Sequence, residues 1–183
     1  LLTLKHGDEH LEQGLEAFLG AADEGDHWLL IVPLDPELLP FDQLRLRSSE
    51  LRRTPLPCSR LLIVENERSL HQLPPLPDTI AILGAGLNLD WMQADWLSRK
   101  KLAYWGDIDT WGLSILATAR SRQPQIIALM MDESTFSKYE PNHAVEEKVS
   151  AAPEPPVSLT LEEQNLYQIL HTLEKGRLEQ EFI

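Results

Sequence analysis

The sequence predicts an α/β fold in which helices flank a mostly parallel central sheet. Between residues 28 and 132, short apolar runs of strand length alternate with segments of helical spacing. This alternation is typical of βαβ units, whose crossover helices cover the faces of a parallel sheet. The four consecutive apolar residues Leu61–Val64 indicate a strand buried on both faces. In open sheets of this kind, the working site lies beyond the carboxyl ends of the strands.

Length and composition narrow the class of protein. The 183 residues suffice for one domain with a real core, but not for two of full size. No apolar run approaches the roughly 18 residues of a membrane span and no signal peptide is recognisable, so we expect a soluble cytoplasmic protein. The single cysteine, Cys58, excludes an intramolecular disulfide framework. Because the chain begins without Met, we expect it to be the C-terminal part of a longer protein.

The predicted elements follow one another in a simple order. Helical spacing indicates an amphipathic helix over 10–22, within an N-terminal segment 1–27. Beyond the core, an acidic, proline-rich loop is predicted at 136–158, and the capping box Thr160–Glu163 opens C-terminal helices within 159–183. Together these parts form a single domain, 1–183. The core, 28–135, is expected to carry the catalytic site on strands at 28–34, 43–47, 60–64, 79–83, 101–105 and 125–132, with helices at 89–97 and 110–121.

Acidic residues stand directly after several of the predicted strands. Glu65 follows one strand, and Asp107 and Asp109 follow another. In extended backbone, residues i and i+2 point to the same face, so the two aspartates would share one locus. Two anions held so closely need a cation or a shared proton, and oxygen-only ligation suits Mg²⁺ or Mn²⁺. Asp132 follows the last predicted strand, which makes it the fourth candidate metal ligand at one edge of the sheet.

Charge bears directly on whether the partner is a nucleic acid. The formal net charge of −13 opposes such binding, because phosphate contacts rely on clustered Lys and Arg. The charged residues are unevenly distributed, however. Residues 132–163 hold eight Asp or Glu against two Lys, whereas residues 45–60 hold five Arg against one Glu. These arginines fit a phosphate-facing strip and the wet face of a strand equally well. Four further cations near predicted strand and helix ends could contact phosphate or simply face solvent: Arg99, Lys100, Lys101 and Arg120.

Three weaker patterns have simpler explanations. His6–His10 matches the inverted zinc-peptidase spelling His-x-x-Glu-His, but it lacks an evident third ligand and indicates a solvated helix start. Gly84–Gly86 lacks the third glycine of a dinucleotide fingerprint and indicates a tight turn. Glu67 fits a solvated residue that opens a helix better than it fits a metal ligand.

Several strings of this chain together resemble one family. A strand ending in Glu, followed by another ending in Asp-x-Asp, is similar to the Toprim domain of topoisomerases and primases, a Rossmann-like fold. The fuller wording, from about residue 28 to the end, resembles the JetD (MksG) nuclease subunits of Wadjet (MksBEFG-type) plasmid-defence complexes, which are related to the A subunit of type IIB topoisomerases. The strings that carry it are Leu62-Ile63-Val64-Glu65-Asn66-Glu67, the Gly84–Gly86 turn, Tyr104-Trp105-Gly106-Asp107-Ile108-Asp109 with Gly112, Met131-Asp132-Glu133 and Leu178-Glu179-Gln180-Glu181.

This resemblance implies a metal-dependent endonuclease that cleaves phosphodiester bonds of plasmid or foreign DNA within an SMC-like defence complex. It implies Mg²⁺ or Mn²⁺ as cofactor and Glu65, Asp107 and Asp109 as catalytic residues. The implied partners are double-stranded DNA, SMC-like, kleisin and accessory subunits, and a second copy of the chain. Members of this family often carry a His where this chain has Trp111, which places any contact made by that side chain in question.

Two other functions fit part of the pattern. A catalytically inactive Toprim-like scaffold that docks onto SMC-complex partners would account for Trp111 and the acidic charge, and it would bind no metal. A phosphoacceptor domain that uses Asp107 would need a lysine near the acyl phosphate, and none follows a strand end convincingly. Tyr104 lies inside a predicted strand and no motif surrounds the other tyrosines, so we expect water to be the nucleophile of a nuclease.

Overall fold

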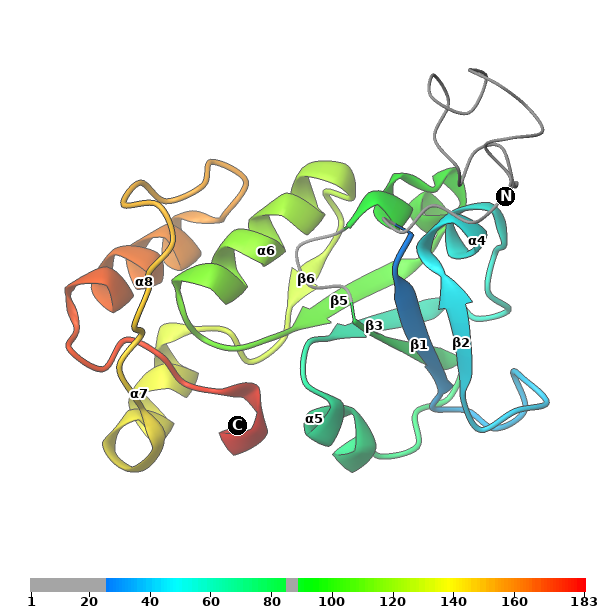
Figure 1. Ribbon diagram of the computed structural model, residues 1–183, viewed down its shortest axis with the longest axis horizontal. Coiled ribbons are helices and arrows are strands. Elements are labelled where there is room, and N and C mark those ends of the chain that lie inside the picture. Colours follow the sequence, from blue (N-terminus) through cyan, green and yellow to red (C-terminus); the bar gives the residue numbers. More distant parts are fainter. Residues whose placement is uncertain (1–25, 85–88) are drawn as a thin grey trace, which may run out of the picture.

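The computed structural model describes residues 26–84 and 89–183. In these residues the chain forms a six-stranded sheet in the order β2-β1-β4-β3-β5-β6 (Figure 1). β4, β3, β5 and β6 run parallel, while β1 pairs antiparallel with both β2 and β4. The predicted mostly parallel α/β fold is therefore confirmed. The predicted N-terminal helix, the His6–His10 pattern and residues 85 and 86 lie outside the described residues.

Most of the predicted strands and helices occupy the expected positions. The apolar runs form strands because their β-branched and leucine side chains fill both faces of a buried sheet. The strands are β1 (Trp28–Pro33), β2 (Leu44–Arg47), β3 (Arg60–Val64), β4 (Thr79–Leu83), β5 (Lys101–Trp105) and β6 (Ile127–Ala128). The α-helices are α4 (Ser48–Arg53), α5 (Glu67–Gln72), α6 (Thr110–Arg122), α7 (Glu133–His143) and α8 (Leu161–Thr172), and the 3-10 helices are η1 (Asp90–Gln93), η2 (Asp95–Arg99) and η3 (Gln180–Phe182).

Each face of the sheet has its own hydrophobic core. Leu61 and Ile63 of β3 belong to the larger cluster, which α4, α6 and α8 also supply. Leu62 and Val64 point the other way and pack with Leu70 of α5. Because alternate residues of β3 enter different cores, the strand is fixed in register, and the residue that follows it has a defined direction.

The helix predicted over 89–97 is wrong, since the chain forms two short 3-10 helices there. Ala94 separates them with an extended backbone, φ −65° and ψ 126°. The break lets Trp91, Met92 and Leu97 all reach the larger core. Apolar side chains at 91, 92 and 97 do not share one face of a continuous α-helix. The helix is therefore interrupted, which allows all three side chains to be buried.

The strand predicted over 125–132 is much shorter than expected. β6 holds two residues at the edge of the sheet, and the Leu129 N–H still donates to the Tyr104 carbonyl oxygen at 2.8 Å. Met130 then takes a positive φ of 54°, which turns the chain away from the sheet. Met131 is buried after that turn, and Asp132 becomes the N-cap of α7.

The loop expected from residue 136 starts later, because α7 continues to His143. Asp132 caps this helix by accepting the Thr135 N–H at 2.7 Å, and Phe136 anchors it in the core. The capping box predicted at Thr160 and Glu163 is present at the start of α8. None of the helices in the described parts of the chain is long and apolar enough to cross a membrane.

Candidate functional site

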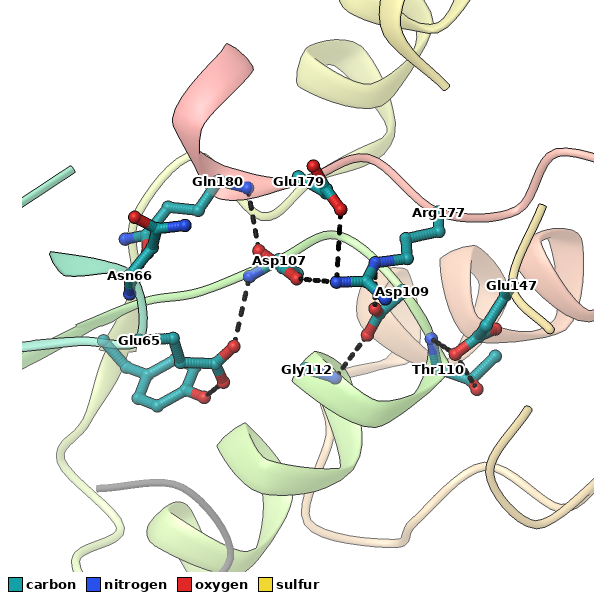
Figure 2. A network of polar contacts seen from close by, with 11 residues as sticks. Glu65, Asn66, Asp107, Asp109, Thr110, Gly112, Glu147, Arg177, Glu179 and Gln180 are labelled. Carbon is teal, nitrogen blue, oxygen red and sulfur yellow. Dashed lines mark hydrogen bonds and ion pairs between the residues drawn. The ribbon is translucent and has the colours of Figure 1, made fainter. Parts of the chain in front are cut away.

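The carboxyl ends of β3 and β5 place Glu65 beside the Asp107–Asp109 stretch (Figure 2). Val64 pairs with Trp105 in the parallel ladder, so the next residues, Glu65 and Gly106, also lie side by side. A Cβ atom on Gly106 would stand 2.8 Å from the Glu65 Oε1 atom. The glycine of this stretch therefore leaves the space that the Glu65 carboxyl group occupies.

Glu65 is held by donors from the neighbouring strand. The Tyr104 hydroxyl donates to Glu65 Oε1, and the Asp107 N–H lies 3.4 Å from Oε2. Burial raises the pKa of Glu65 to about 8, and the negative charge of Asp107 adds to the rise. The side chain therefore carries a proton at neutral pH when no cation is close, and it can donate or accept one near physiological pH.

Asp109 is fixed by the first turn of α6. It is the N-cap of that helix, and its Oδ1 atom accepts the Gly112 N–H at 2.6 Å. A Cβ atom on Gly112 would lie 2.2 Å from the Asp107 carbonyl oxygen, so the turn closes only around a glycine. Burial raises the pKa of Asp109 to about 6, with further contributions from the charges of Asp107 and Glu147.

A basic side chain from the end of the chain reaches the two aspartates. Arg177 Nη2 lies 3.0 Å from Asp107 Oδ2, and Arg177 Nε lies 3.4 Å from Asp109 Oδ2 (Figure 2). Nη2 also lies 3.5 Å from a carboxylate oxygen of Glu179. Burial opposes the charge of Arg177, but Asp107 and Asp109 outweigh it and raise the pKa of the guanidinium.

Backbone hydrogen bonds hold this last segment across the strand ends. Leu178 and Ile108 exchange two N–H···O bonds, at 2.9 and 3.0 Å. The Gln180 N–H donates to Asp107 Oδ1 at 2.8 Å. The buried Gln180 side chain accepts the Asn66 N–H and donates to the Trp105 carbonyl oxygen, each at 2.8 Å. Residues 177–180 therefore join the ends of β3 and β5 and cover the acidic residues.

A cavity of about 620 Å³ opens beside Asp109 and Arg177. Glu147 lies on its wall and accepts the N–H and hydroxyl hydrogens of Thr110 at 3.1 and 2.7 Å. Trp111 also lines this cavity, with its indole N–H donated to the Val149 carbonyl oxygen at 2.8 Å and its side chain substantially exposed. Trp111 therefore has a fixed orientation next to the acidic residues.

The chemistry of the donor set fits a hard divalent cation. Glu65, Asp107 and Asp109 offer carboxylate oxygens, which Mg²⁺ and Mn²⁺ prefer. Burial is the main cause of the raised pKa values of Glu65 and Asp109, and the negative charge of Asp107 adds to both. Among residues 26–84 and 89–183, no group of three or more His, Cys, Asp or Glu side chains is placed so that it could hold a metal ion. Arg177 lies against both aspartates instead.

The other sequence-predicted ligands and cations lie elsewhere. Asp132 lines a different cavity, of about 870 Å³, and hydrogen bonds from Ser134 and Thr135 lower its pKa. Glu67 is exposed at the start of α5, 3.7 Å from His71. The prediction that the acidic residues lie at one edge of the sheet thus holds for three of the four. It fails for Asp132 because the turn at Met130 carries the chain off the sheet before that residue.

The cations expected to contact DNA are not at the acidic edge. Lys101 begins β5, so Arg99, Lys100 and Lys101 lie at the opposite end of the strand from Asp107. The Lys100 ammonium donates to the carbonyl oxygens of Leu56 and Cys58. Arg120 is partly buried, forms an ion pair with Glu163 and donates to the Ser158 carbonyl oxygen, so it joins α6 to α8.

Sequence reasoning overlooked three residues that complete the site: Arg177, Gln180 and Glu147. The string Leu178–Glu181 contributes to the family resemblance, but nothing local in the sequence indicates that it reaches the strand ends. The available signal was a cation directly before that string, since crowded acidic residues need a counter-charge.

The fold and the positions of the acidic residues together define a class of protein. A mostly parallel α/β sheet with converging carboxylates at the ends of β3 and β5 is consistent with a Rossmann-like Toprim fold. The chain belongs to a family described as "Wadjet protein JetD, C-terminal", whose model matches residues 14–183. This membership supports a role in the Wadjet defence system. Comparison with curated proteins gave no match.

Proposed function

We propose that this chain is the nuclease domain of a Wadjet defence complex, and that it cleaves phosphodiester bonds of plasmid or foreign DNA with Mg²⁺ or Mn²⁺. The observation that carries the proposal is the convergence of Glu65, Asp107 and Asp109 from two strands, with raised pKa values at Glu65 and Asp109. Perturbed carboxyl groups that meet at the strand ends of an α/β sheet mark a working site. Membership of the JetD family supports the same conclusion.

The residues have distinct tasks in this reaction. Asp107 and Asp109 are the metal ligands in this proposal, because both contact the same cation, Arg177, and α6 fixes Asp109. A bound divalent ion would offset the charge that develops on the scissile phosphate and on the departing oxygen. Glu65, with its pKa near 8, is suited to take the proton from an attacking water or to protonate the departing oxygen. Tyr104 donates to Glu65 and keeps it oriented rather than attacking DNA.

The setting of this reaction is a multi-subunit assembly in the cytoplasm. SMC-like, kleisin and accessory subunits would deliver double-stranded DNA to the domain, and a second copy of the chain could cut the opposite strand. Delivery by partners matters because the chain carries a net charge of −13 and does not attract DNA by itself. Membership of the JetD family supports a multi-subunit defence complex, and these particular partners are part of the proposal.

An inactive scaffold is the second candidate, and Arg177 favours it. A guanidinium that already pairs with Asp107 and Asp109 could replace a metal permanently. In that case the acidic residues would serve to hold residues 177–183 in place, and partner subunits would use the resulting surface.

Plasmid cleavage by the assembled complex separates the two functions. We expect Mg²⁺ or Mn²⁺ to support nicking or cutting, and we expect Asp107→Ala and Glu65→Ala to abolish it. Glu67→Gln is the matched control, because Glu67 is an exposed carboxylate only two residues from Glu65. Cleavage by both alanine variants at the wild-type rate would refute the assigned site. Absence of cleavage by the wild-type complex would favour the scaffold.

A further inference from the structure

The two aspartates of the site take their counter-charge from one flexible side chain. Of the ion pairs in residues 26–84 and 89–183, those that reach Asp107 and Asp109 all come from Arg177. Both aspartates are largely buried, with 16% and 6% of their side chains exposed. Two neighbouring buried carboxylates would repel each other strongly without a cation. Arg177 therefore supplies the positive charge that a bound ion would otherwise supply.

Arg177 nevertheless holds Asp109 loosely. The Nε atom of Arg177 is buried and has no hydrogen-bond partner among the described residues, although Asp109 Oδ2 is 3.4 Å away. The Arg177 side chain is 39% exposed, far more than either aspartate. A contact of this kind gives charge compensation without the paired, well-aligned hydrogen bonds of a permanent Arg–carboxylate bridge.

The backbone of Arg177 is anchored independently of its side chain. Arg177 and Val145 exchange two N–H···O bonds, at 2.8 and 3.1 Å. The side chain can therefore leave the aspartates while residues 177–180 stay in place. The cavity of about 620 Å³ that Arg177 lines is also lined by Glu146 and Glu179, which offer the guanidinium other carboxylates. Glu179 is already within 3.5 Å of Arg177.

We propose that Arg177 stands in for the divalent cation: its guanidinium compensates Asp107 and Asp109 in the metal-free protein and gives way when the ion binds. This inference rests on the proposed metal site and adds the competition that controls it. The guanidinium and the metal ion then compete for the same carboxylate oxygens, so each weakens the hold of the other. The displaced guanidinium remains beside the site, where a phosphate oxygen of the substrate is a suitable new partner.

Mn²⁺ titration of the 183-residue chain at pH 7, followed by calorimetry, tests the competition. We expect Arg177→Gln to bind Mn²⁺ about tenfold more tightly than the wild type, because one ion pair no longer has to be broken. Arg68→Gln is the matched control: it removes the same charge from a side chain that pairs with Glu181 in the same C-terminal segment, and it should leave the affinity unchanged. Arg177→Lys keeps a positive charge without the planar fork and should lie between.

Thermal unfolding gives a second measurement that a purely structural role would not reproduce. In EDTA, Arg177→Gln should unfold at a lower temperature than the wild type, because the aspartates lose their counter-charge. With saturating Mn²⁺ the difference should shrink, since the ion supplies that charge. Unchanged or weaker Mn²⁺ binding by Arg177→Gln, or a temperature difference that Mn²⁺ leaves intact, overturns the stand-in role alone. If neither protein binds Mn²⁺, the proposed metal site fails as well.

Discussion

Neighbouring carboxyl groups in this site have different partners. Asp107 accepts hydrogen bonds from Arg177 and Gln180, at 3.0 and 2.8 Å. Glu65 accepts a hydrogen bond from the Tyr104 hydroxyl and forms no ion pair within the described residues, and burial is the main cause of its raised pKa. Glu65 is therefore the group suited to exchange a proton near neutral pH.

The raised pKa values make stability depend on pH. The pKa of Glu65 rises from 4.5 to about 8 on folding, so its contribution to stability is fully present below about pH 4.5 and is lost as the pH rises through 8. We therefore expect the melting temperature in EDTA to fall between pH 6 and pH 8. Asp109, whose pKa is about 6, has already lost most of its contribution to stability at pH 6, so the fall in this window reports mainly on Glu65. Glu65→Gln should flatten the fall in this window, and Glu67→Gln should not. An equal fall in wild type and Glu65→Gln would contradict the assigned cause.

Gly112 is the residue at which added volume should do most harm. A Cβ atom there would lie 2.2 Å from the Asp107 carbonyl oxygen, and backbone has to move to admit it. We expect Gly112→Ala to lower the free energy of unfolding by about 1–3 kcal/mol, measured by urea denaturation. Ser114→Ala, two residues along the same helix, should change it by less than about 1 kcal/mol. Equal losses in the two variants would argue against crowding at Gly112.

At the scale of elements, the last residues of the chain complete the site that the strands begin. The acidic residues follow β3 and β5, whose own cations, Arg60 and Lys101, lie at the opposite ends of these strands. Leu178 bridges to Ile108, and this pairing brings Arg177 and Gln180 over the strand ends. A site assembled in this way depends on the C-terminal segment as much as on the sheet.

Gln180 should be the polar residue whose loss disturbs this assembly most. Its side chain is buried and pairs with the Asn66 N–H and the Trp105 carbonyl oxygen. Gln180→Ala leaves both backbone groups unpaired, so we expect a loss of about 2–3 kcal/mol in the free energy of unfolding. Gln168→Ala, on the exposed face of α8, should be neutral within about 0.5 kcal/mol. A neutral result for Gln180→Ala in urea denaturation would mean that water replaces both bonds.

The strands and helices that were predicted correctly are those that a short stretch of sequence is enough to indicate. Leu61–Val64 and Lys101–Trp105 are strands because both faces are buried, and the order of these strands places Glu65 and Asp107 at one edge. The sequence did not predict where Asp132 lies, because one positive φ at Met130 changes the direction of the chain. Nor did it predict Arg177, since contact between residues 107 and 177 depends on how distant segments pack.

At the scale of the whole molecule, the arginine-rich stretch 45–60 lies away from the acidic site. Arg45, Arg52, Arg53 and Arg60 are exposed on or near β2, α4 and the start of β3, whereas Glu65 follows the far end of β3. Arg47 is partly occupied, because it stacks over the Trp28 ring 4.8 Å from the ring centroid. DNA that reaches the acidic site therefore meets few of the chain's own cations.

The isolated chain should accordingly bind DNA weakly. Its net charge is −13, and non-specific binding by proteins rests on phosphate contacts whose dissociation constants are about 1–100 μM in physiological salt. We expect fluorescence anisotropy with a labelled duplex to give a dissociation constant above about 1 μM at roughly 0.15 M salt, with or without Mn²⁺. The double variant Arg52→Gln/Arg53→Gln should weaken it further and reduce its salt dependence, whereas Glu133→Gln/Glu162→Gln, which removes two acidic charges, should strengthen it slightly. Nanomolar binding by the chain alone would mean that positive charge on the chain itself, rather than the partner subunits, delivers the DNA.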